Sequence, residues 1–262
     1  DPTIAASGSV QVDFIKITGT YPTTVAAIPG TIQAENFNKG GQENAYNDAT
    51  PTTNSGNQYR TTEGVDIAVH PQEPGNFVVG WTSAGEWMEY IVQIQKETFY
   101  NMQAWVSSTG NTARISIVID GEIITPEIVI PNTGAYTTYQ AVNVVTNKKL
   151  AIGTHVIRIQ ANTAGFNIDK LICNDAVQTQ TIALAKGWNL ISVSVIETAN
   201  DGNAIHRIFT GKDVKIVKNA DGFWKPNQPN QFNSLQTLEP GNGYLVYMNT
   251  AGTITISGIP CT

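Results

Sequence analysis

Three residues in predicted loops have side chains that suit sugar binding. Trp81 follows an apolar strand and precedes the turn 83–85, Tyr136 follows the turn 131–135, and Asn167 precedes the last strand of a β-rich stretch. An aromatic ring offers a flat apolar surface to the C–H face of a sugar, while an amide both donates and accepts hydrogen bonds. Rigid scaffolds commonly carry binding residues on such loops. A tryptophan is also common in β-protein cores, so each residue alone is a weak indication.

Catalytic chemistry has less support. A glycosidase needs two carboxyl groups roughly 5 to 9.5 Å apart, one of them with a raised pKa. Glu86 and Glu89 flank Trp87, but strand alternation turns Glu86 away from both of the others. Glu63 and Asp66 stand in a predicted turn, where solvated carboxylates are usual. No Gly-x-Ser-x-Gly elbow, His-Glu-x-x-His or phosphate-binding glycine loop occurs. The alternative, a hydrolase with its own cleft carboxylates, is therefore supported by no sequence motif.

Composition argues against several other classes. Among 262 residues, 15 are basic and 21 acidic, the formal net charge is −6, and charged residues make up only 14% of the chain. Nucleic acids need a basic face and are not expected partners. His70, His155 and His206 lack zinc-ligand spacing. No run approaches the ~18 apolar residues of a membrane span. The amide- and hydroxyl-rich composition favours a secreted all-β protein.

Short strands with a period of two follow one another between residues 31 and 174. The stretches 87–95, 99–107 and 115–119 alternate in this way, and Asp120-Gly121 after the third is a hairpin signal. The positions expected to share buried faces are Met88, Tyr90, Val92, Ile94, Tyr100, Met102, Ala104, Val106, Ile115, Ile117 and Ile119. Because no helical period interrupts these strands, the pattern predicts a β-sandwich.

The flanking segments predict two further parts. Residues 1–30 contain an alternating segment and a Thr/Pro/Gly linker, and we expect either the last strand of a preceding similar domain or a coincidental strand within 1–17. Residues 175–262 contain strands and a helical turn near 203–209, which predicts a small β-rich domain. Cys173 and Cys261 are the only cysteines, and the sequence leaves open whether they pair.

Residues 31–174 resemble a family 6 carbohydrate-binding module over essentially the whole domain. The motifs that carry this resemblance stand in the family's order and spacing: Ile32–Phe37, Gly56–Arg60, Val65–Ile67, Val79–Tyr90, Ile130–Tyr136, Gly153–Arg158 and Gly165–Asp169. The resemblance implies a non-catalytic β-jelly-roll sandwich that binds plant, algal or microbial polysaccharide beside an enzyme domain. The expected fold class of the chain is thus all-β, a β-jelly-roll sandwich followed by a smaller β-rich domain.

The resemblance also implies site residues. In the family, a loop-end cleft holds a sugar between two aromatic rings with an asparagine beneath, and those positions match Trp81, Tyr136 and Asn167. The second ring is often tryptophan in the family, so Tyr136 is expected to weaken binding or to shift its preference. Tyr46 and Asp66 lie in a region that resembles members recognising the end of a β-glucan or agar-type chain. They are further candidates for the cleft wall.

A structural calcium ion is a second implication of the resemblance. The family's ion lies where the first and last strands meet, at positions matching Gln33, Glu35 and Asp169. Gln33 and Glu35 share one strand face by their i, i+2 spacing, and oxygen ligands suit Ca²⁺. An ordinary carboxylate pair at a strand end is the alternative.

Some family members carry a second site on a concave sheet face. The tryptophan used there matches Trp87, and Trp105 also lies opposite its apolar neighbours, so an exposed pair of tryptophans would form a candidate glycan platform. A glutamate that supports this site in some members is replaced by Val118. Packing of both tryptophans under loops is the alternative.

The C-terminal segments Gly187–Ser192 and Gly241–Val246 look like motifs of a small β-module of secreted bacterial multidomain proteins. Trp188 and Tyr244 are expected in its core, and Trp224 is expected to be a loop residue that covers the core. A spacer, or a platform for the binding module, is the default role.

Together these observations predict a secreted or cell-surface bacterial module that keeps a glycoside hydrolase of the same polypeptide near a β-glucan, xylan or agar-type chain, or near the chain's end. Linked binding raises the local substrate concentration without changing the chemical step. The alternatives are a hydrolase in its own right and a structural adhesion or spacer segment.

Overall fold

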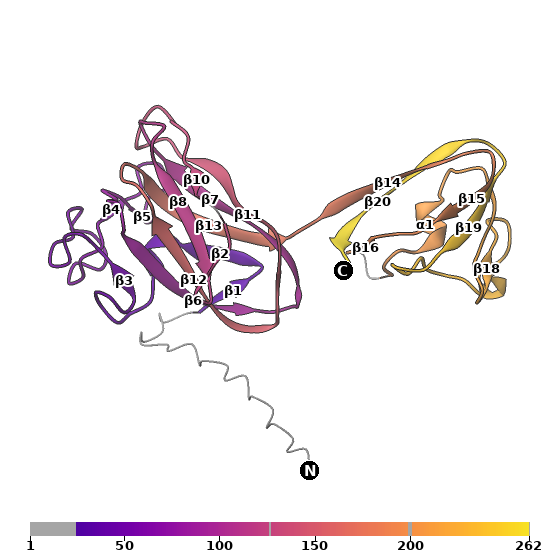
Figure 1. The fold of residues 1–262 in the computed structure, drawn as a ribbon, viewed down its shortest axis with the longest axis horizontal. Coiled ribbons are helices and arrows are strands. Elements are labelled where there is room, and N and C mark those ends of the chain that lie inside the picture. Colours follow the sequence, from indigo (N-terminus) through magenta and orange to yellow (C-terminus); the bar gives the residue numbers. More distant parts are fainter. Residues whose placement is uncertain (1–24, 126, 199–200, 262) are drawn as a thin grey trace, which may run out of the picture. The chain divides into compact units, whose positions relative to one another are not determined.

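The computed structural model describes residues 25–125, 127–198 and 201–261 (Figure 1). The chain divides into two compact units. The first contains Gln103–Val145, Gly153–Ile172 and the described residues up to Gln95, and the second contains Lys96–Met102, Thr146–Ile152 and the described residues from Cys173 onward. The domain boundaries expected at residues 30 and 174 stay predictions, and the strand expected within 1–17 lies outside the described residues. In the part of the chain that is described, no helix has the length and apolar character of a membrane span.

Two sheets form the sandwich. The first has the order β1 (Ala26–Ile28), β6 (Trp87–Ile94), β12 (Gly153–Ala161), β8 (Arg114–Ile119) and β10 (Ile128–Val129), with β3 (Tyr46–Asn47) beside β6 and β9 (Glu122–Ile123) beside β8. The second has the order β11 (Gln140–Leu150), β7 (Thr98–Ser107), β13 (Asn167–Asp175), β5 (Phe77–Val79) and β4 (Ile67–Val69), with β2 (Gly30–Gln33) beside β13. A short 3-10 helix, η1 (Ala34–Asn36), follows β2.

Alternation along the strands builds the sandwich core as predicted. The side chains expected on the inner faces of β6, β7 and β8 are all buried: Met88, Tyr90, Val92, Ile94, Tyr100, Met102, Ala104, Val106, Ile115, Ile117 and Ile119. Burying one large aliphatic or aromatic side chain contributes roughly 1.5–3 kcal/mol, so two facing rows of this kind supply the main driving force. The all-β sandwich predicted from the sequence is confirmed.

The second unit contains two smaller sheets. One has the order β14 (Gln178–Leu184), β20 (Gly252–Pro260) and β16 (Val195–Glu197), and the other has the order β15 (Gly187–Ile191), β19 (Tyr244–Met248), β17 (Val214–Lys218) and β18 (Phe223–Trp224). The predicted helical turn is α1 (Ile205–Ile208), and a 3-10 helix, η2 (Asn230–Phe232), follows β18. Both sheets contribute to one apolar cluster that includes Leu184, Val217, Val246 and Ile256.

Three aromatic residues of this unit test the sequence-based expectations. Tyr244 is buried in the core as expected. Trp224 was expected in a loop, but it lies in β18 and is a buried member of the core, where it stacks on Phe209 with 6.2 Å between the ring centroids. Trp188 was expected in the core, but its side chain is 53% exposed. The reason is that β15 turns Trp188 and Leu190 outward together, away from the apolar cluster.

The two cysteines are both free. Cys173 is buried, and burial raises the pKa of its thiol to about 12. The thiol therefore stays protonated at neutral pH, and Cys173 is a packing residue of β13 rather than a reactive one.

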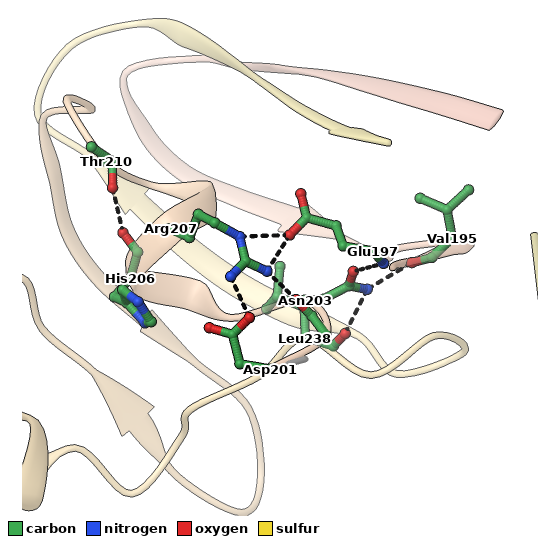
Figure 2. Close-up of polar contacts among 9 residues, drawn as sticks. Val195, Glu197, Asp201, Asn203, His206, Arg207, Thr210 and Leu238 are labelled. Atoms are coloured by element: carbon green, nitrogen blue, oxygen red, sulfur yellow. Dashed lines mark hydrogen bonds and ion pairs between the residues drawn. The ribbon is translucent and has the colours of Figure 1, made fainter. Parts of the chain in front are cut away.

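A buried asparagine ties together three segments of the second unit (Figure 2). Asn203 is 3% exposed, and its Nδ2 donates to the carbonyl oxygens of Val195 at 2.6 Å and Leu238 at 3.0 Å. Its Oδ1 accepts from the backbone N–H of Glu197 at 2.8 Å. Nearby, the Arg207 guanidinium binds the Glu197 carboxylate, with Nε at 2.9 Å from Oε2. The amide thus satisfies backbone groups that packing has removed from water.

We expect Asn203→Ala to destabilise the second unit by about 2–4 kcal/mol, because it leaves buried backbone groups without partners. Urea unfolding combined with hydrogen exchange of residues 178–260 measures this loss. Asn242→Ala is the matched control, because Asn242 is an exposed asparagine of the same unit. Equal protection in the two variants would contradict a structural role for the Asn203 amide.

Candidate functional site

Trp81, Tyr136 and Asn167 come together around one open cleft. The cleft has a volume of about 430 Å³ and is lined by Ala68, Val78, Gly80, Trp81, Thr82, Tyr136, Ala164, Gly165, Phe166 and Asn167. Both rings are accessible, since Trp81 is 56% and Tyr136 43% exposed. A volume in the range of about 300–1,000 Å³ with few polar groups is typical of small-molecule sites. The structure therefore brings the three sequence-predicted residues into one site.

The loop after β5 holds Trp81 in an unusual conformation. Trp81 has a φ of 50°, a left-handed value that is uncommon for a bulky residue and is frequent at functional sites. On one side, the backbone N–H of Gly80 donates to the carbonyl oxygen of Asp66 at 2.9 Å. On the other, Thr82 Oγ1 donates to the carbonyl oxygen of Phe166 at 2.7 Å and accepts from its N–H at 3.2 Å. Thr82 thus joins the Trp81 loop to the segment that precedes β13.

Hydrogen bonds also position the other two residues. Asn167 Nδ2 donates to the carbonyl oxygen of Tyr136 at 3.2 Å, and Ser107 Oγ donates to the same oxygen at 2.8 Å. Gly80 makes room for the amide, because a Cβ at this position would lie 2.8 Å from Asn167 Oδ1. Gly80, Thr82 and Ser107 were not among the predicted site residues. The one local signal was Gly80 next to Trp81, because a glycine in or beside a strand often marks a place where another group lies very close to the backbone.

Two exposed rings and one amide thus line the same cleft of a β-sandwich. Residues 55–174 match the model of the family described as carbohydrate binding module (family 6). This segment is therefore a family 6 carbohydrate-binding module, as the sequence motifs indicated. Members of this family bind carbohydrate without catalysis, so the match indicates binding by this segment.

Several solved structures are similar to part of this chain. The C-terminal family 6 module of LamC, a marine laminarinase from Zobellia galactanivorans, is 21% identical over 56% of this chain and 98% of that chain, with a TM-score of 0.43. A family 6 module of Cellvibrio mixtus lichenase 5A in complex with cellotriose is 23% identical over 56% and 98%, with a TM-score of 0.41. A β-1,3-glucan-binding family 6 module from Bacillus halodurans is 19% identical over 58% and 99%, with a TM-score of 0.41. Comparison with curated proteins finds no match.

The structure does not place Tyr46 or Asp66 in the cleft, which corrects their expected role in its wall. Tyr46 is 3% exposed, packs edge-on against Phe37 with 5.3 Å between the ring centroids, and its Oη accepts from the N–H of Gly64 at 3.0 Å. Asp66 is 5% exposed, and its carboxylate accepts the N–H of Ser55. Both side chains stabilise the segment between β3 and β4, because buried polar groups need such partners.

Trp87 and Trp105 do not form a common platform, which corrects the expected pair. Trp87 belongs to β6 in the first sheet and Trp105 to β7 in the second, so their outward faces lie on opposite sides of the sandwich. The Arg158 guanidinium lies 3.9 Å from the centroid of the Trp87 ring and is paired with Glu89 at 2.6 Å. Lys170 Nζ lies 5.4 Å from the Trp105 ring. Strand alternation shows which face a residue takes, not which sheet its strand joins.

The carboxylates considered for catalysis have structural partners. Glu86 accepts from the backbone N–H groups of Ala49 at 3.1 Å and Ser83 at 2.8 Å, and burial raises the pKa of its carboxyl. Glu63 pairs with the Arg60 guanidinium. None of these groups lines the cleft that Trp81 borders. Their positions agree with a binding site rather than an acid–base pair.

Of the three predicted calcium ligands, Gln33 is the last residue of β2 and Asp169 belongs to β13, which pairs with β2. Glu35 lies in η1 and not, as expected, on the same strand face as Gln33. Gln33 Oε1, Glu35 Oε2 and Asp169 Oδ1 are buried oxygen atoms that accept no hydrogen bond within the described residues. Burial, together with the charge of Asp169, raises the pKa of Glu35 to about 7. Leaving these three oxygen atoms in the interior without hydrogen-bond donors is unfavourable, and a cation would offset this cost. A set of hard oxygen donors of this kind fits Ca²⁺.

A neighbouring group of possible ligands does not extend this set. His70 Nδ1 accepts from the N–H groups of Gln72 at 3.1 Å and Glu73 at 2.9 Å, so the imidazole proton is on Nε2, which faces Asp169 Oδ2 at 3.9 Å. Lys170 Nζ lies 3.0 Å from the same Asp169 oxygen and 3.3 Å from Glu73 Oε1. Lys170 therefore pairs with Asp169 Oδ2, His70 Nε2 lies beyond hydrogen-bond distance of it, and the candidate cation ligands are the three oxygen atoms described above.

Proposed function

We propose that the cleft formed by Trp81, Tyr136 and Asn167 binds a β-glucan, xylan or agar-type polysaccharide, along the chain or at its end. The observation that carries this proposal is that two exposed rings and one amide line the same cleft. The rings would stack on the C–H faces of a pyranose, and the Asn167 amide would hydrogen-bond its hydroxyl groups. An open cleft of this kind also leaves room for the chain to continue beyond the bound unit.

A binding module does not catalyse a reaction itself, so the proposed role of this one depends on the catalytic domain attached to it. A module of this kind is useful when it keeps a catalytic domain on its substrate, because tethering converts each encounter into an intramolecular one. The proposed context is a secreted bacterial glycoside hydrolase whose catalytic domain belongs to the same polypeptide.

The proposal includes a structural calcium ion. Gln33, Glu35 and Asp169 would hold it through the buried oxygen atoms between β2 and β13. The ion would supply positive charge for the two carboxylates and would tie the start of the sandwich to its last strand. The ion would have no part in contacting the sugar, because none of its three ligands lines the cleft.

Affinity electrophoresis of the full chain tests the function. Gels containing laminarin, xylan, agarose or hydroxyethylcellulose are compared with a gel without polysaccharide, and reducing ends are assayed in parallel. Retardation by one or more glycans without release of reducing ends supports the proposal. Release of reducing ends would identify a hydrolase instead, and mobility unchanged in every gel would favour a spacer segment.

A further inference from the structure

The second unit turns an apolar strand face toward solvent. In β15, Trp188 is 53% and Leu190 77% exposed. The residue between them, Asn189, is held to the backbone of Ala185, with Oδ1 accepting its N–H and Nδ2 donating to its carbonyl oxygen, both at 2.8 Å. Strands normally direct their apolar side chains to the core and their polar ones outward. A local reversal of this pattern indicates a functional surface.

Neighbouring strands extend this face. Trp188 is paired with Tyr247, and the two rings pack edge to face with 5.2 Å between their centroids. Leu190 is paired with Leu245, and Lys218 lies on the other side of Leu245. We call the surface formed by Trp188, Leu190, Lys215, Lys218, Leu245 and Tyr247 the Trp188 face.

Two lysines give the Trp188 face a positive charge. Lys218 Nζ lies 5.0 Å from the Trp188 ring centroid, and Lys215 Nζ lies 5.2 Å from that of Tyr247. No ion pair within the described residues involves either ammonium group. The described acidic residues from 178 onward have other partners: Glu197 and Asp201 bind Arg207, Asp213 accepts from Asn249, Asp221 from Asn219, and Glu239 from Thr237. Neither ammonium group therefore has a carboxylate of the described residues within ion-pair distance.

The size of the Trp188 face argues for a narrow ligand. It lies on three strands of five residues each, β15, β19 and β17, and so measures about 16 Å by 14 Å, or on the order of 230 Å². A stable protein interface needs about 800 Å² on each partner. An extended sugar chain needs far less, and flat rings suit its C–H faces.

We propose that the Trp188 face binds an anionic polysaccharide, with pyranose rings on Trp188 and Tyr247 and acidic groups at Lys215 and Lys218. This site is separate from the Trp81 cleft and does not depend on it. It would give the chain a second glycan contact of different charge preference.

The test uses the full chain carrying Trp81→Ala, so that the cleft cannot contribute. Affinity gels contain polygalacturonate or dextran sulfate as carboxylate and sulfate probes, dextran as a neutral sugar, or polyglutamate as a polyanion without sugar rings. Retardation by polygalacturonate or dextran sulfate, and not by dextran or polyglutamate, is expected. Equal retardation by polyglutamate would show charge attraction only and would overturn the proposal, as would no retardation by either acidic glycan.

Variants then locate the site. Trp188→Ala is expected to weaken binding of the retarding probe about tenfold, and Lys215→Gln/Lys218→Gln by a similar factor that shrinks as salt is raised. Phe232→Ala and Lys212→Gln are matched controls, because both residues are exposed in the same unit but outside the Trp188 face. These controls should bind like the parent. Retention of binding by both the tryptophan and the double-lysine variants would overturn the assignment, and thermal melting confirms that each variant is folded.

Discussion

Replacing Trp81 with alanine is expected to abolish retardation by the neutral glycan that the unmodified chain binds best. The ring is 56% exposed at the cleft, so its removal deletes the largest flat surface available to a sugar. Loss of one central aromatic contact typically costs about 2–4 kcal/mol, which corresponds to roughly a 30- to 1,000-fold weaker affinity. Affinity electrophoresis and calorimetric titration with the same glycan measure the change.

Asn167→Ala tests the polar half of the same site. It removes the hydrogen bond to the Tyr136 carbonyl oxygen together with any bond to a sugar hydroxyl, and we expect a loss of the same order. Trp188→Ala is the control for both variants, since it removes an equally exposed tryptophan outside the cleft and should leave neutral-glycan binding intact. If Trp81→Ala and Asn167→Ala both bind like the parent, the cleft is not the binding site.

Removal of calcium is expected to lower the melting temperature of the sandwich. A ligand present at 100 times its dissociation constant stabilises the folded state by about 2.7 kcal/mol. For a domain of this size, that corresponds to a shift of roughly 5–15 °C. Differential scanning calorimetry with excess calcium, and then with a chelator, measures the shift. A melting temperature that is the same in both buffers, with no calcium in the native mass spectrum, would rule out the ion.

The Glu35→Gln variant sharpens this test. It removes one carboxylate from the pair that Glu35 forms with Asp169, so the calcium-dependent shift should largely disappear. In chelator the variant should be at least as stable as the parent, because an uncompensated buried charge is gone. Glu43→Gln is the control, since Glu43 is an exposed glutamate of the same domain and its loss should leave the shift unchanged. A full calcium shift in Glu35→Gln would place the ion elsewhere.

Strand alternation and turn residues were sufficient to predict the sandwich and its inner faces. Met88 and Tyr100 are buried as their patterns indicate, because burial of one strand face is a local, periodic requirement. The same holds for Trp81 and Tyr136, which lie next to turns and were predicted in loops. Their meeting with Asn167 was predicted only through resemblance to a family, since the three residues come from distant segments.

The burial of some side chains and the sheet to which a strand belongs depended on long-range contacts, which a local sequence pattern does not predict. Tyr46 and Asp66 became buried anchors because neighbouring loops supplied partners for their polar atoms. Trp87 and Trp105 were separated because strand order, which long-range pairing decides, placed them in different sheets. The sequence by itself thus determined which residues alternate and where turns interrupt them. The tertiary structure decided which faces meet, because a strand is buried only by what packs against it, and for Trp188 nothing in its own unit does so.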